Sequence, residues 1–336
     1  MEYTSAPSTF TTSTTTTVTM TVTRQLTKTA ARVFGQLEGG GNPVTIFTSS
    51  VSLQPATRVA LAQSCAWESV VVDRTRRSMA FYLPTGEPVD FCAHAAMGGV
   101  TQLLAPSAGS DASQSVSFTT DHADDTTRYT AHLHDHNIVA LDLRTVYEEA
   151  PVPHPPTVRR ILREAFGLRA GDLTQPPPRQ SADAKPPYPT LRNASVARPK
   201  TLVYVNSLET LHAVKVPPVT NHHFRVACDA IGSTGVYLYA FDAADDTWAC
   251  RQFPRASGYP EDPATGVAAA ALAVALHKAG HVRDAYKCTQ GTAMGQGSVL
   301  LVEDIQRRNA DNHVSLRILG RVETDESEVM EIEEPE

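Results

Sequence analysis

The chain has 336 residues, of which 41% are hydrophobic and 19% charged, and its mean hydropathy is −0.22. These values are typical of a globular protein long enough for two domains. The formal net charge is −7, but residues 323–336 hold eight acids and no Lys or Arg, so the rest of the chain is nearly neutral. No basic stripe for nucleic acid is therefore expected. The longest apolar run, residues 267–276, is too short to cross a membrane.

The first twenty residues are rich in Thr and carry no charge between Glu2 and Arg24. They lack the basic and apolar regions of a secretory signal, so we expect a disordered extension and a cytoplasmic protein. Strand-like alternation of Val and Thr begins at residue 21. Two strand-like pieces then flank the sequence GGGNP, residues 39–43, where glycines let a ligand approach the backbone closely. A tight connection without a ligand explains the same glycines.

Residues 52–67 show helical periodicity, with Pro55 in the first turn, and a strand-like SVVVDR follows. Glu68 therefore lies at a helix-to-strand junction, where a side chain can reach into a cleft. A solvent-exposed junction Glu is the alternative interpretation.

Two further stretches each set a titratable residue at the start of a helix of small residues. In residues 79–104 a strand leads through a turn to His94, and in residues 257–280, SGYPEDPATGVAAAALAVALHKAG, Asp262 precedes a long apolar helix. Helix N-termini carry unpaired N–H groups and a partial positive charge, so an anion can bind there. The parallel suggests two similar halves whose helix N-termini face one cleft. Simple capping of a core helix by Asp262 is the alternative.

The middle of the chain predicts strands over residues 128–144, a short helix over 158–167 and a Pro-rich loop or linker over 171–199. His132, His134 and His136 alternate on one strand face, but no fourth ligand lies nearby and no metal is expected. Five cysteines without CxxC spacing also argue against zinc or a disulfide framework. Further strands are predicted at residues 201–207, 236–241, 248–253, 297–303 and 313–322. The acidic tail, 323–336, is predicted to be disordered.

Four separated blocks carry a resemblance to a known family: GGGNPVTIF, the Glu68 junction, PTGEPVDFCAHA and EDPATGVAAAALA. The segment TQGTAMGQGSVLLVE adds a weaker fifth. In order and spacing they resemble the PhzF-like isomerases of phenazine biosynthesis, which share the diaminopimelate epimerase fold.

The resemblance implies an α+β fold with two pseudo-repeated domains, each an antiparallel barrel-like sheet around a central helix, and an active site between them. The first domain would span residues 21–150, with strand 313–322 as a candidate to complete it, and the second residues 200–312. A homodimer and a role in secondary metabolism would be in keeping with the family.

The family pattern also implies roles for individual residues. Glu68 would be the catalytic acid/base, while His94 and Asp262 position or protonate the substrate. The reaction implied is a cofactor-free isomerisation of a small carboxylated metabolite, in which a proton moves between carbons. Backbone N–H groups at the two helix N-termini would hold the carboxylate. The residues expected to contact the substrate are Asn42, Ala93, Ala95, Thr265, Gly266 and Val267.

Several positions depart from the family pattern. Trp67 replaces a Ser, Ala93 a Gly, Val267 a Ser and Gln296 an Arg, which suggests a different, more apolar substrate than the phenazine precursor. Relatives on this fold that use two cysteines as acid and base have them where this chain has His94 and Asp262.

Cys92, two residues before His94, is expected to pack in the core instead. Two alternatives to the isomerase stay open: an epimerase acting at an activated carbon, and a non-catalytic binding protein that retains the fold.

Overall fold

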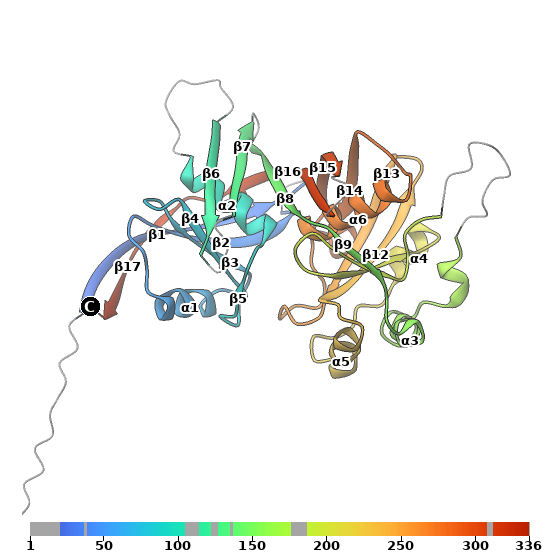
Figure 1. Cartoon of the computed structure of the whole chain (residues 1–336). Coiled ribbons are helices and arrows are strands. Elements are labelled where there is room, and N and C mark those ends of the chain that lie inside the picture. Colours follow the sequence, from blue (N-terminus) through green and yellow to red (C-terminus); the bar gives the residue numbers. More distant parts are fainter. Residues whose placement is uncertain are drawn as a thin grey trace, which may run out of the picture.

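The computed structural model describes residues 21–36, 39–104, 114–121, 127–134, 137–175, 187–307 and 312–335. Figure 1 shows two lobes, each a curved sheet around one helix. The helix of the first lobe is α2 (Ala93–Leu103) and that of the second is α6 (Gly266–Lys278). The extension predicted to be disordered, residues 1–20, lies outside the described residues.

The sheet of the first lobe closes into a ring. Its strands pair in the order β1, β2, β3, β4, β6, β7, β8 and β16, and β16 pairs again with β1. The short β5 adds to β4. The strands are β1 (Thr21–Val33), β2 (Asn42–Ser49), β3 (Ser69–Asp73), β4 (Ser78–Tyr82), β5 (Pro88–Val89), β6 (Gln114–Thr120), β7 (Arg128–His134), β8 (Ile138–Val146) and β16 (His313–Thr324).

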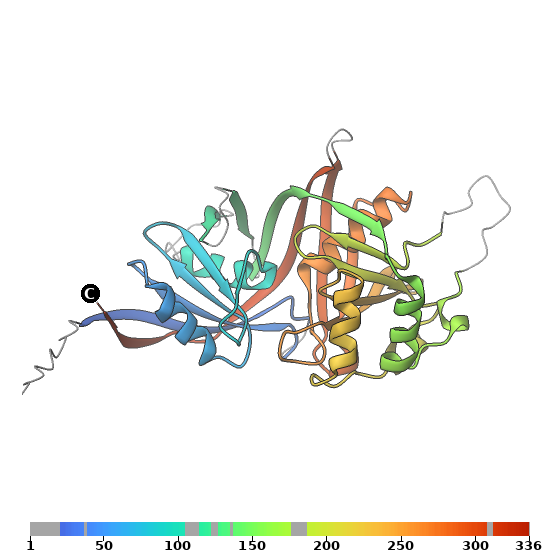
Figure 2. The same cartoon turned by 60° about the horizontal axis from the view of Figure 1, so that its bottom comes forward.

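The second lobe repeats this arrangement and shares its edge with the first. The pairing order is β9, β10, β11, β12, β13, β14, β15 and β16, and β9 continues β8 after a single residue. Both lobes therefore meet along β8 and β16, as Figure 2 also shows. The additional strands are β9 (Glu148–Pro151), β10 (Arg192–Ser195), β11 (Lys200–Tyr204), β12 (Gly235–Asp242), β13 (Thr247–Pro254), β14 (Ala285–Gln290) and β15 (Ser298–Arg307).

The chain order of elements reveals the pseudo-repeat. In the first lobe β2 crosses through α1 to the parallel β3, a hairpin forms β4, and α2 leads to β6 parallel to β4. In the second lobe β11 crosses through α4 and α5 to the parallel β12, a hairpin forms β13, and α6 leads to β14 parallel to β13. The predicted fold of two repeats around central helices is thus confirmed. The sheets are mixed rather than purely antiparallel, because helical crossovers join parallel strands.

Burial explains the composition of the central helices. In α6 every residue from Gly266 to Leu276 is buried, which accounts for an apolar run without a polar face. In α2, a Cβ on Gly98 would lie 3.1 Å from Val44, and one on Gly99 would lie 3.0 Å from Met79. Small residues therefore let the sheet wrap tightly around the helix.

The remaining helices cover the outside of the lobes. The helix predicted at residues 52–67 is shorter, so Glu68 follows a loop rather than the helix end directly. The predicted strands of the second lobe and the helix capped by Gly167 are present. None of the helices in the described segments is long and apolar enough to span a membrane. These outer helices are α1 (Pro55–Gln63), α3 (Pro155–Phe166), α4 (Leu208–Ala213) and α5 (His222–Ala230), with 3-10 turns at Ala170–Leu173 and Thr292–Met294.

The prediction of a disordered tail over residues 323–336 is wrong for its described part. β16 extends to Thr324, and β17 (Glu328–Pro335) pairs antiparallel with β1. Met330 and Ile332 pack on a small apolar cluster, while the buried Glu334 lies 3.5 Å from Arg24 and accepts a hydrogen bond from the Gln54 amide. Arg24 of β1 thus offsets part of the negative charge of the tail.

The predicted loop over residues 171–199 also needs correction. It contains β10, which pairs with β9 and β11 and closes the ring of the second lobe. Residues 176–186, which include most of its prolines, lie outside the described residues. Because the two lobes share hydrogen-bonded strands, the boundaries 21–150 and 200–312 stay predictions.

Candidate active site

The predicted site residues of the two lobes meet where the central helices begin. Gly266, the first residue of α6, is so close to the start of α2 that a Cβ on it would lie 3.0 Å from the Cβ of Ala93. His94 is the second residue of α2 and Asp262 lies four residues before α6. The structure therefore brings the two helix N-termini together, as the sequence predicts.

Asn42 connects the lobes at this point. It is the first residue of β2, and its Nδ2 donates to Asp262 Oδ1 at 2.6 Å and to the Ala264 carbonyl at 2.7 Å. The same Nδ2 lies 3.5 Å from His94 Nδ1. Asn42 is 1% exposed, so these contacts are shielded from water. One amide thus fixes the turn of the second lobe against the first.

The turn around Asp262 is held by hydrogen bonds within the turn and from β14. Thr265 donates its hydroxyl to Asp262 Oδ2 at 2.6 Å, and the Ala264 amide donates to Oδ1 at 3.3 Å. From β14, Gln290 donates to the Asp262 carbonyl at 2.6 Å and accepts from the Thr265 amide at 3.3 Å. These bonds orient the Asp262 carboxylate and fix the turn that leads into α6.

Glu68 lies immediately before β3 and is 4% exposed, so the structure does not support the alternative of a solvent-exposed junction residue. Its Oε1 accepts a hydrogen bond from the hydroxyl of Tyr259, on the loop that leads to Asp262. Its Oε2 is buried and has no hydrogen-bond partner among the described residues. One carboxylate oxygen is therefore held from the opposite lobe, and the other is left without a partner among the described residues.

Tyr259 was not predicted as a site residue. Its ring packs against Trp67, with centroids 5.9 Å apart and planes at 48°. Trp67, where the family pattern has Ser, thus covers the tyrosine that contacts Glu68. No local pattern indicated this contact, because it joins residues 191 positions apart.

Burial and neighbouring charge perturb the titratable groups of the site. Burial, reinforced by the charge of Glu68, raises the pKa of Asp262 to about 7. Burial lowers the pKa of His94, so a neutral imidazole is favoured at neutral pH. Burial and then the Glu68 charge raise the pKa of Cys92 to about 12, so this thiol stays protonated. Cys92 packs in the core as predicted.

The residues predicted to contact the substrate all lie around these groups. They come from the first residue of β2, from the first turns of α2 and α6, and from the residue before α6, and every one is buried. Their role in binding stays a prediction. They are Asn42, Ala93, Ala95, Thr265, Gly266 and Val267.

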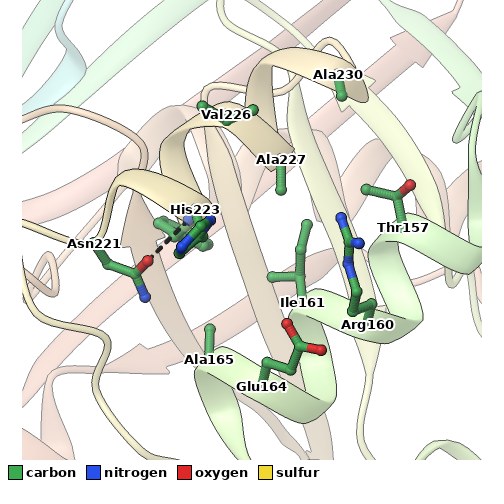
Figure 3. A pocket seen from close by; sticks show the side chains of 11 residues that line it. Thr157, Arg160, Ile161, Glu164, Ala165, Asn221, His223, Val226, Ala227 and Ala230 are labelled. Atoms are coloured by element: carbon green, nitrogen blue, oxygen red, sulfur yellow. Dashed lines mark hydrogen bonds between the residues drawn. The ribbon is translucent and has the colours of Figure 1, made fainter.

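Two other features lie apart from this site. A cavity of about 580 Å³ is lined by one face of α3 and one of α5, including Arg160, Glu164 and Val226, but by none of the predicted site residues (Figure 3). On β7, His132 Nε2 lies 3.1 Å from Asp142 Oδ2. His136 lies outside the described residues. Within the described ranges, no three or more His, Cys, Asp or Glu side chains are grouped to hold a metal ion.

Two closed α+β lobes, each around a central helix, form a fold of the kind found in racemases and epimerases. The chain is similar to a PhzF-family protein from Bacillus anthracis, with 17% identity, a TM-score of 0.70 and coverage of 91% of this chain and 99% of that one. It is similar to a predicted epimerase from Pseudomonas aeruginosa, with 22% identity, a TM-score of 0.67 and the same coverage. It is also similar to a hydroxyproline epimerase from Agrobacterium vitis, with 11% identity, a TM-score of 0.54 and coverage of 93% and 94%.

The sequence matches the family model of phenazine biosynthesis-like proteins over residues 32–325, and the chain belongs to this family. No curated protein matches the sequence. The epimerase-type structures share the fold of this chain.

Proposed function

We propose that the protein is a cofactor-independent isomerase of a small carboxylated metabolite, in which Glu68 moves a proton between two carbons. The observation that carries this proposal is the state of the Glu68 carboxylate. It is buried, one oxygen is bound by Tyr259, and the other has no hydrogen-bond partner in the described part of the chain. A carboxylate in that state can take a proton from an acidic carbon and return it to another.

His94 and Asp262 are proposed to support this transfer from the two helix N-termini. With a pKa of about 7, Asp262 is partly protonated at neutral pH and can donate a hydrogen bond or a proton to the substrate. The neutral His94 can donate a hydrogen bond from α2. The first N–H groups of each helix have no intrahelical acceptor, so they can hold the substrate carboxylate and stabilise developing negative charge.

Epimerisation at an activated carbon is the second candidate. The observation that favours it is the presence of two buried carboxyl groups, Glu68 and Asp262, one from each lobe. Such groups could serve opposite faces of one carbon.

The test is a thermal-shift screen against small cyclic and unsaturated carboxylates, followed by NMR of each hit in D₂O. Deuterium at the receiving carbon with migration of a double bond supports the isomerase. Deuterium with inversion and no migration supports the epimerase. Binding without exchange supports a non-catalytic binding protein and rejects both reactions.

A further inference from the structure

Two polar side chains of the second lobe lie on the side of the sheet that faces α6, and a third residue, Arg198, is close to one of them in the chain. Lys200 is the first residue of β11, and the residues at its alternate positions, Leu202 and Tyr204, belong to the core around α6. On β13, Gln252 alternates in the same way with Cys250. Arg198 lies two residues before Lys200, in the connection between β10 and β11.

The register places Lys200 and Gln252 on either side of a glycine. Thr201 pairs with Val236, so Lys200 and Gly235, the residues before them, are neighbours. A Cβ on Gly235 would lie 2.5 Å from Gln252 Nε2. The side-chain amide of Gln252 therefore lies over Gly235, in the space that a side chain at position 235 would occupy.

This group of side chains adjoins the candidate site. The Gln252 carbonyl accepts a hydrogen bond from the Asp262 amide at 2.9 Å. The charge of Arg198 lowers the pKa of both His94 and Lys200, after the larger effect of burial, so the guanidinium lies within electrostatic range of both. Arg198 thus brings positive charge near His94 and Lys200.

The hydrogen-bonding capacity of these side chains is largely unused. Gln252 is 1% exposed, and neither its side-chain oxygen nor its nitrogen has a partner within the described ranges. The buried Nε of Arg198 likewise has none among these residues. The Nζ of Lys200 donates to the Thr234 carbonyl at 3.4 Å, which is a long hydrogen bond. Buried polar groups normally have partners, so a bound polar group would satisfy the unused donors and acceptors here.

We propose that Arg198, Lys200 and Gln252 bind a second carboxylate of the substrate, which is therefore a dicarboxylate and not the more apolar molecule that the departures from the family pattern suggest. A guanidinium, an amine and a carboxamide N–H suit a carboxylate, since charge-assisted hydrogen bonds to it are the strong ones. Burial lowers the pKa of Lys200 to about 7, and a bound carboxylate would favour its protonated form. This inference rests on the proposed function for the place of the first carboxylate, at the N-termini of α2 and α6.

Calorimetric titration with benzoate, phthalate, isophthalate and terephthalate tests the subsite without chemistry. These rings have no acidic sp³ carbon, and the three dicarboxylates cover three spacings of the second group. We expect at least one of them to bind about tenfold tighter than benzoate, the effect of one charge-assisted hydrogen bond. Arg198→Met and Gln252→Met should each remove most of that preference. Arg225→Ala, which removes an exposed cation of α5, is the control and should keep it.

Equal binding of all four probes to the wild type would overturn the proposal, as would a preference that survives in both Met variants. The outcome is separate from that of the proposed function. A dicarboxylate preference that depends on Arg198 supports the subsite even if no ligand exchanges deuterium. Deuterium exchange without such a preference supports the isomerase and rejects the subsite.

Discussion

Replacing Asp262 by Asn should change how the stability of the protein depends on pH. Burial and the charge of Glu68 raise the pKa of Asp262 from 3.8 to about 7, so the folded protein disfavours the ionised carboxylate. At about 1.36 kcal/mol for each pKa unit, ionisation of this group costs about 4 kcal/mol of stability.

The direction follows from proton binding. Between about pH 4 and pH 7 the folded protein holds a proton that the unfolded chain has lost, so the contribution of Asp262 to stability falls as pH rises through this window. Asn does not ionise and keeps the acceptor for Asn42. Relative to the wild type, Asp262→Asn should therefore gain up to about 4 kcal/mol from pH 4 to pH 7, whatever its constant offset. Glu68 and Lys200, the other charged groups that act on Asp262, are unchanged in the variant.

Urea denaturation of both proteins at half-unit steps from pH 4 to pH 8 measures this difference. Asp90→Asn, which neutralises an exposed carboxylate of the first lobe, is the matched control. A difference between Asp262→Asn and wild type that stays constant over the window, or that moves in favour of the wild type as pH rises, would refute the reasoning.

Two further predictions follow, one for the contact of Tyr259 with Glu68 between the lobes and one for the packing of the C-terminal tail. Tyr259→Phe removes the hydroxyl that holds Glu68, so we expect kcat to fall about tenfold with a smaller change in KM; an unchanged kcat would contradict a positioning role. Ile332→Ser in β17 should lower the unfolding free energy by about 1 kcal/mol, because Ile332 packs on the cluster under the sheet. Val329→Ser, on the same strand but 70% exposed, is its control, and equal effects in urea denaturation would argue against a docked tail.

The central helices and the placement of the main site residues could be predicted because their signals are local. Residues 267–276 carry no charge and must be buried on all sides, and the position of Asp262 before this run fixes it near the helix N-terminus. The position of His94 follows from the same logic in α2. The catalytic role of Glu68 was predicted only from the family resemblance, because its local sequence fits a solvent-exposed junction equally well.

Contacts between distant segments could not be predicted in this way. The tail joins β1, about 300 residues earlier, and its charge alone suggested disorder. The contact of Tyr259 with Glu68 crosses between lobes. The proximity of Lys200 and Gln252 depends on the register of three strands and on the absence of a side chain at Gly235, and neither can be seen in a local sequence pattern. Each of these features depends on pairing that no single segment encodes.

Deuterium exchange by Glu68→Gln tests the central claim most directly. Gln keeps the size of the side chain and can still accept from Tyr259, but it cannot carry the proton. With any ligand that the wild type labels in D₂O, the variant should bind with similar affinity and lose exchange by a factor on the order of 10²–10⁴. Glu87→Gln, at an exposed position of the same lobe, should exchange like the wild type. Full exchange by Glu68→Gln would contradict the role proposed for this residue.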